Sequence, residues 1–223
     1  MRKWGLVVSL FFGAVILALL VPTSLLLASK PIPKAREFLD LYEDLATWIC
    51  VGTVIAGQAL LLWLKVDTTQ KRLKPRTRLL LSAITTGLFL AILTLSIIFC
   101  AGLGIRGDKF MDILPDTFPA TAVFICYAGS WLVWGIVFYR LYRNSDDPVS
   151  RAVTWLLRGS VLELLIAVPA HVVARRRDDC SAPVVTSYGI AAGLAIMLIS
   201  FGPGVLLLYR KRMERYTRNP AGK

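Results

Sequence analysis

Residues 147–208 read DPVSRAVTWLLRGSVLELLIAVPAHVVARRRDDCSAPVVTSYGIAAGLAIMLISFGPGVLLL, and this stretch decides the fold. It holds two long apolar runs separated by the polar segment RRRDDC at residues 175–180. A helix of about 20 apolar residues is long enough to cross the hydrocarbon core of a bilayer. Asp147 followed by Pro148 is typical of a helix start, with the carboxylate as cap and proline in the first turn. The stretch therefore predicts two membrane-spanning helices joined by a short exposed turn.

Similar apolar runs fill the rest of the chain. Of its 223 residues, 56% are hydrophobic and only 18% are charged, whereas soluble domains are about 25% charged. We expect one all-α transmembrane domain over residues 1–223, a polytopic integral membrane protein built as a bundle of six transmembrane helices. The expected spans are residues 4–28, 45–64, 79–103, 118–139, 152–174 and 184–208, followed by a basic tail at residues 209–223.

The net charge of +12 predicts an orientation rather than a nucleic-acid partner, because the basic residues flank the spans. With six spans, 18 Lys and Arg residues lie on the side of the two termini and 8 lie on the other side. The positive-inside rule then places both termini in the cytoplasm, and we expect a bacterial cytoplasmic (inner) membrane. The expected partners are the bilayer and the anionic lipid headgroups at the basic cytoplasmic loops. A second copy or a partner subunit is compatible with this organisation.

Glu163 is an acidic residue in the middle of the fifth expected span. A carboxylate at the centre of a membrane helix costs roughly 2.5–3.5 kcal/mol on insertion scales, so it should face other helices or water. Ala167 and His171 follow at intervals of four residues and therefore lie along the same helix face. This pattern predicts an ion or proton site at Glu163 with His171 as its outer relay. The alternative is a structural carboxylate bonded to a hydroxyl group on a neighbouring helix.

A run of five charged residues follows this helix on the side that should be poor in basic residues. The run consists of Arg175, Arg176, Arg177, Asp178 and Asp179. Its position above Glu163 and His171 predicts the mouth of the proposed site. The alternative is a self-paired loop that contacts lipid headgroups.

The cysteines and the single histidine all fall in the predicted outer half of the membrane. These residues are Cys50, Cys100, Cys126, Cys180 and His171. Thiolate and imidazole groups bind zinc and copper, so a metal or redox site is a second hypothesis. The lack of a close CxxC pair opposes it, and cysteine also packs well as a small apolar residue. No cofactor is firmly implied, and one histidine excludes a haem held between two histidines.

The last expected span carries two glycine features. Gly189 and Gly193 form a GxxxG pair, which is typical of close packing between membrane helices. Gly202, Pro203 and Gly204 predict a hinge or the end of the helix.

The sequence leaves three functions open, and it favours a protein that is not an enzyme without deciding the point. The chain lacks the phosphate-binding GxxxxGK[ST] motif. The first hypothesis is that the protein binds, senses or moves a small ion or solute through the polar site on the fifth span. The second is the metal or redox protein, and the third is a structural or accessory subunit of a membrane complex.

Overall fold

The computed structural model describes residues 2–28, 42–43, 45–66, 75–113, 120–143, 147–177 and 179–218. Within these ranges the regular secondary structure is helical throughout and no strand occurs. The all-α prediction is therefore confirmed for this part of the chain.

The first predicted span is a continuous helix with a wider turn in its middle. It consists of α1 (Arg2–Val15), the π-helical segment η1 (Ile16–Leu20) and α2 (Val21–Ala28). Pro22 is the second residue after the π segment, and its ring crowds the preceding turn, which a π turn accommodates. The Leu17 carbonyl in this segment accepts a hydrogen bond from the Tyr42 hydroxyl at 2.6 Å. The irregular turn is thus fixed by a residue that comes much later in the chain.

The other predicted spans also correspond to helices. They are α4 (Leu45–Val66), α5 (Pro75–Arg106), α6 (Ala120–Tyr142), α7 (Pro148–Arg176) and α8 (Ala182–Arg218), and the 3₁₀ helix η2 (Gly107–Ile113) follows α5. Five helical segments of the described chain are long and apolar enough to cross a membrane. The apolar part of α4, Val51–Leu62, is shorter than these five.

The two ends of the 147–208 stretch differ in how well the sequence predicts them. The start of α7 is confirmed, because the Asp147 carboxylate accepts a hydrogen bond from the Ser150 N–H at 3.3 Å. The helix end predicted at residues 202–204 is wrong, since α8 continues as one helix to Arg218. The alternative, a hinge within the helix, stays a prediction. Proline removes only one hydrogen-bond donor, and long membrane helices tolerate this loss. Most of the predicted tail is therefore an extension of α8.

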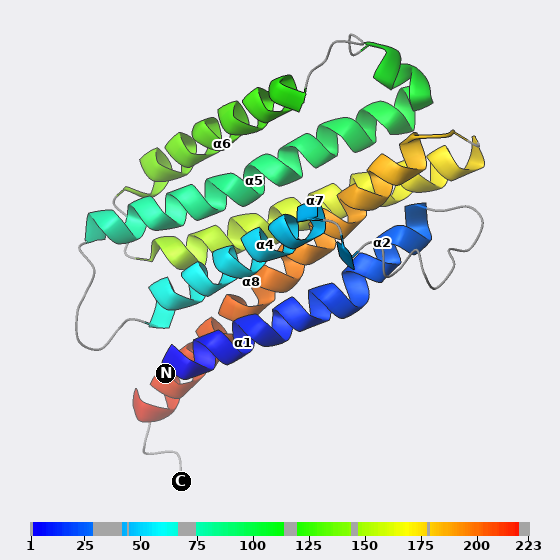
Figure 1. Cartoon of the computed structure of the whole chain (residues 1–223). Helices are drawn as coiled ribbons and strands as arrows, with labels where there is room; N and C mark the ends of the chain where they lie inside the picture. Colours follow the sequence, from blue (N-terminus) through cyan, green and yellow to red (C-terminus); the bar gives the residue numbers. More distant parts are fainter. Residues whose placement is uncertain are drawn as a thin grey trace.

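The helices lie side by side, with α6 at one edge and α1 and α2 at the other (Figure 1). Helix α7 packs against both α5 and α8, whereas α6 packs mainly on α5. Helices α2 and α4 contact α8 from the other side. The start of α1 and the end of α8 lie at the same end of the bundle (Figure 1).

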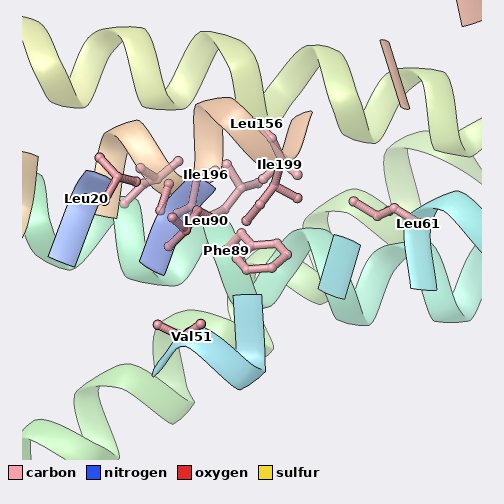
Figure 2. Close-up of a cluster of buried hydrophobic side chains, with 11 residues drawn as sticks. Leu20, Val51, Leu61, Phe89, Leu90, Leu156, Ile196 and Ile199 are labelled. Atoms are coloured by element: carbon pink, nitrogen blue, oxygen red, sulfur yellow. The ribbon is translucent and has the colours of Figure 1, made fainter. Parts of the chain in front are cut away.

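A cluster of buried aliphatic and aromatic side chains joins most of these helices at the centre of the bundle. Figure 2 shows its labelled members, Leu20, Val51, Leu61, Phe89, Leu90, Leu156, Ile196 and Ile199. Lipid chains are as apolar as these side chains, so the gain comes from close packing rather than from exclusion of water. The α4 glycine Gly57 illustrates the fit, because a Cβ atom there would lie 2.3 Å from the ring of Phe89.

Candidate functional site

The carboxyl group of Glu163 is enclosed where α5, α7 and α8 meet. The side chain is 0% exposed. The Ser96 hydroxyl on α5 donates a hydrogen bond to Glu163 Oε1 at 2.7 Å. The other oxygen, Oε2, is also buried and has no hydrogen-bond partner in the described part of the protein. The sequence therefore predicts correctly that Glu163 faces other helices.

Two glycines on α8 make the space that the carboxyl group occupies. A Cβ atom at Gly193 would lie 1.8 Å from Glu163 Oε2. A Cβ atom at Gly189 would lie 2.6 Å from Cys100 Sγ, 2.8 Å from Ser96 Oγ and 3.2 Å from Glu163 Oε1. The GxxxG pair thus supports close packing, and it also forms the wall against which the acid rests. We call Glu163, Ser96, Cys100, Gly189 and Gly193 the Glu163 cluster.

The thiol of Cys100 completes this cluster one helical turn after Ser96 on α5. Cys100 is buried, and its Sγ lies 3.9 Å from the Ser96 hydroxyl oxygen. Cys126 on α6 and Cys180 between α7 and α8 are both exposed. Cys50 lies in α4, but its side chain is outside the described set. No group of three metal-ligating side chains forms within the described residues, so the metal or redox hypothesis gains no support from their positions.

His171 lies two turns after Glu163 on α7 and has a different partner. Its Nδ1 lies 2.9 Å from the Thr186 hydroxyl oxygen on α8. The single proton of that hydroxyl has the Ala182 carbonyl at 2.8 Å and the Pro183 carbonyl at 3.2 Å as acceptors. With the proton donated to either carbonyl, the hydroxyl oxygen is able to accept a hydrogen bond from a protonated Nδ1. His171 is eight residues from Glu163, about 12 Å along the helix axis. The structure therefore does not place the two side chains in contact.

Small apolar side chains separate the two polar groups. Ala167 and Ala170 on α7 pack with Cys100 and Ile190 in one buried cluster. The face predicted from the spacing of Glu163 and His171 does point into the bundle, since both residues are buried. Its middle section is occupied by close packing, so the predicted relay would need the helices to separate.

The arginines of the predicted mouth contact the ends of neighbouring helices. The Arg175 guanidinium donates to the backbone carbonyls of Leu26 and Leu27 at the end of α2. The Arg177 guanidinium donates to the Ile105 carbonyl near the end of α5 at 3.4 Å. A helix C-terminus carries unpaired carbonyls and partial negative charge, which cations stabilise. These contacts tie the α7–α8 turn to two other helices.

The remaining charged residues of this turn have varied surroundings. Arg176 is exposed, and Asp178 lies outside the described residues. Asp179 packs beside Gly107, which has φ +63°, and a Cβ atom at that glycine would lie 2.9 Å from Asp179 Oδ2. A glycine is therefore required at this position both by its backbone conformation and by the neighbouring carboxylate.

Asp108 caps α8 from a different loop, a role that the sequence does not reveal. Its carboxylate accepts hydrogen bonds from the Cys180 N–H at 2.7 Å, the Ser181 hydroxyl at 2.8 Å and the Ala182 N–H at 3.0 Å. These bonds, led by the one from Cys180, hold the pKa of the Asp108 carboxyl below its usual range. Helix N-termini commonly use such a carboxylate, but it usually lies next to the helix in sequence.

Gln58 is a second buried polar side chain that sequence analysis misses. It lies on α4, is 0% exposed, and neither atom of its amide group has a hydrogen-bond partner in the described part of the chain. The signal in the sequence is a single amide within an otherwise apolar run. Ser96 and Thr186 give a similar but weaker signal, because hydroxyl groups are common in membrane helices.

Comparison of the chain with protein-family models, with curated proteins and with solved structures finds no match.

Proposed function

We propose that this chain is a six-span membrane protein with both termini in the cytoplasm. Helix α4 has 22 residues, which corresponds to about 33 Å of helix and is enough to cross a hydrocarbon core. An even number of spans fits the positions of the start of α1 and the end of α8 (Figure 1). The 18 basic residues on the side of the termini, against 8 on the other side, support the orientation. The basic loops then face anionic lipid headgroups.

We further propose that the protein senses protons through the carboxyl group of Glu163. The observation that carries this proposal is the buried Oε2 atom, which has no partner in the described part of the chain. An ionised Glu163 would keep one hydrogen bond, from Ser96, in a place enclosed by apolar helices. Burying an unpaired charge costs far more than burying a neutral polar group. The closed packing therefore fits the protonated acid.

A proton fits this cluster better than a metal cation does. Hard cations such as Ca²⁺ and Mg²⁺ take six or more oxygen ligands. The Glu163 cluster supplies two carboxylate oxygens and the Ser96 hydroxyl oxygen. A single proton needs only one of these atoms, and it removes the charge that the site cannot stabilise.

Loss of that proton would affect the contact between α7 and α8. An ionised Oε2 needs water or a new donor, and the backbone of α8 at Gly193 blocks the approach. Water reaches the oxygen only if α7 and α8 move apart. The protonation state of one carboxyl group is thus coupled to helix packing, which is the physical requirement for a pH-responsive membrane protein.

The buried thiol of Cys100 offers a direct test of this coupling. The purified protein in lipid vesicles is treated with a membrane-permeant maleimide over a range from mildly acidic to alkaline pH. Labelling of Cys100 is measured by peptide mass spectrometry relative to the exposed Cys126. We expect labelling of Cys100 to rise steeply at alkaline pH in the wild type, because ionisation of Glu163 separates α7 from α8 next to the thiol.

The Glu163→Gln variant separates this opening from the ordinary pH dependence of thiol reactivity. Glutamine keeps the shape of the protonated acid and cannot ionise, so Cys100 should stay protected at every pH tested. Replacement of the exposed Glu43 by glutamine is the matched control and should behave as wild type. Equal labelling in the wild type and in Glu163→Gln would contradict proton sensing. It would favour a purely structural carboxylate, as expected for an accessory subunit.

A further inference from the structure

An apolar groove runs along the surface between α5 and α6. Its volume is about 700 Å³. Leu80 and Ile84 of α5 line one wall, and Leu132 and Ile136 of α6 line the other. All four side chains are exposed. In a membrane the groove therefore opens directly to the lipid chains.

One end of this groove is positively charged. Arg140, in the last turn of α6, and Arg143, directly after its end, line it together with Tyr139. Both arginines are exposed. Tyrosine is common at the membrane–water interface, where one end of the ring is wet. The groove thus has an apolar body and a cationic end at the expected depth of a headgroup.

The length of the groove matches one leaflet of the bilayer. Trp131 lines it toward the middle of α6, and its indole N–H donates to the Ile84 carbonyl on α5 at 2.9 Å. Arg140 lies nine residues and Arg143 twelve residues after Trp131, about 14 and 18 Å along the helix. Half of a hydrocarbon core about 30 Å thick is about 15 Å. A single acyl chain is therefore long enough to extend from the arginines to the tryptophan.

We propose that this groove binds one anionic phospholipid of the cytoplasmic leaflet. Its phosphate is held by Arg140 and Arg143, and one acyl chain lies between α5 and α6. Gly135 lines the groove, and an added Cβ atom there would lie 3.8 Å from the Ala83 carbonyl, which is an ordinary van der Waals contact. The site rests on the proposed orientation but not on proton binding by Glu163, so the two proposals fail separately.

The natural fluorescence of Trp131 reports occupation of the groove. The full-length protein is placed in vesicles that contain phosphatidylcholine with a small fraction of either phosphatidylglycerol or phosphatidylcholine brominated on its acyl chains. Quenching of Trp131 is taken as the difference between the wild type and Trp131→Phe. We expect brominated phosphatidylglycerol to quench at a concentration on the order of tenfold lower than brominated phosphatidylcholine, since two arginines attract its phosphate.

The charge variants test whether the two arginines cause this preference. Arg140→Gln with Arg143→Gln should abolish the tenfold preference. Arg151→Gln with Arg158→Gln removes the same charge from exposed positions of α7 outside the groove and should leave the preference intact. Equal loss in both double variants would overturn the proposal, because it would show a general surface potential instead of a site.

A filled groove provides a second, independent variant. Gly135→Leu places a side chain in the path of the acyl chain and should prevent quenching by both brominated lipids while both arginines remain. Unchanged quenching in this variant would overturn the proposal. Full competition by glycerol phosphate, which has no acyl chains, would also overturn the proposal, because the occupant would then be a soluble anion. A dimer whose contact covers Trp131 would overturn it as well, because the occupant would then be a second copy of the chain.

Discussion

Replacing Gly193 by alanine should push the Glu163 carboxyl group out of its place. The added Cβ atom would lie 1.8 Å from Oε2, 2.9 Å from Cδ and 3.1 Å from Leu164 Cγ. Such overpacking typically costs about 1–3 kcal/mol. The exchange of glycine for alanine within a helix returns up to about 1 kcal/mol. We therefore expect the free energy of unfolding to fall by about 1–2 kcal/mol.

The matched control is Gly129→Ala on α6, where an added Cβ atom meets nothing within 4 Å. This variant should be as stable as the wild type or slightly more stable. Unfolding of the purified proteins in detergent micelles by increasing denaturant measures both changes. Equal stability of Gly193→Ala and Gly129→Ala would refute the account of the Glu163 cluster.

A double-mutant cycle identifies which side chain the new methyl group meets. In a Glu163→Ala background the carboxyl group is absent, so Gly193→Ala should no longer destabilise the protein. The coupling between the two positions should be about 1–3 kcal/mol, the range for residues in contact. A loss that persists in the Glu163→Ala background would assign the clash to another neighbour and contradict the reasoning.

Three further predictions concern the contacts at the end of the bundle where the chain passes from α7 to α8. Asp108→Ala should lower stability by about 1 kcal/mol, as for a lost helix cap. Because the folded-state pKa of Asp108 is lowered, the stability that the cap contributes is present above the usual pKa range and is lost as the pH falls through the folded-state pKa. The unfolding temperatures of the wild type and the variant should therefore approach each other at acidic pH. A difference that stays constant with pH would be evidence against the cap. Thr186→Val removes the hydroxyl partner of the buried His171 Nδ1 and should cost about 1 kcal/mol, the typical net contribution of one hydrogen bond; a neutral effect on denaturant unfolding would contradict a stabilising role for this contact. Arg175→Gln should speed amide hydrogen exchange strongly at the end of α2 and only a little in α8. The same change at the exposed Arg176 should leave exchange at α2 unaltered. Equal effects of Arg175→Gln and Arg176→Gln would refute capping of α2 by Arg175.

The helices themselves could be predicted from the sequence because each needs a long apolar run of its own. The expected spans at residues 79–103, 118–139 and 152–174 all lie inside or largely within α5, α6 and α7. The end of α8 could not be predicted in the same way. Glycine and proline weaken a helix locally, but the preceding and following turns hold it together through residues 202–204.

The candidate site was predictable only in part. A lone acid in an apolar span must be sheltered, so the burial of Glu163 follows from the cost of its charge. The spacing of Gly189 and Gly193 predicts a close helix contact, but it does not say which side chain fills the space. Spacing also aligns His171 with Glu163 on one face, yet which α8 residue reaches the imidazole depends on the register between two helices. The sequence of a single helix does not contain that register.

The cap at Asp108 shows the same limit more strongly. Its hydrogen-bond partners follow it by 72 to 74 residues. Such a contact depends on how the ends of α5, α7 and α8 come together at one surface. Helical periodicity carries no information about contacts between residues so far apart in the sequence. The arginines at residues 175–177 likewise find their carbonyl partners only after the bundle has assembled.

The protonation state of Glu163 tests the central claim most directly. Infrared difference spectroscopy of the protein in lipid vesicles detects the C=O stretch of a protonated carboxyl group buried in an apolar place. We predict that the wild type shows this band at neutral pH, that the band disappears at alkaline pH, and that Glu163→Gln lacks it at every pH while Glu43→Gln retains it. A wild-type spectrum without the band at neutral pH, or a band that persists in Glu163→Gln, would contradict proton binding at this residue.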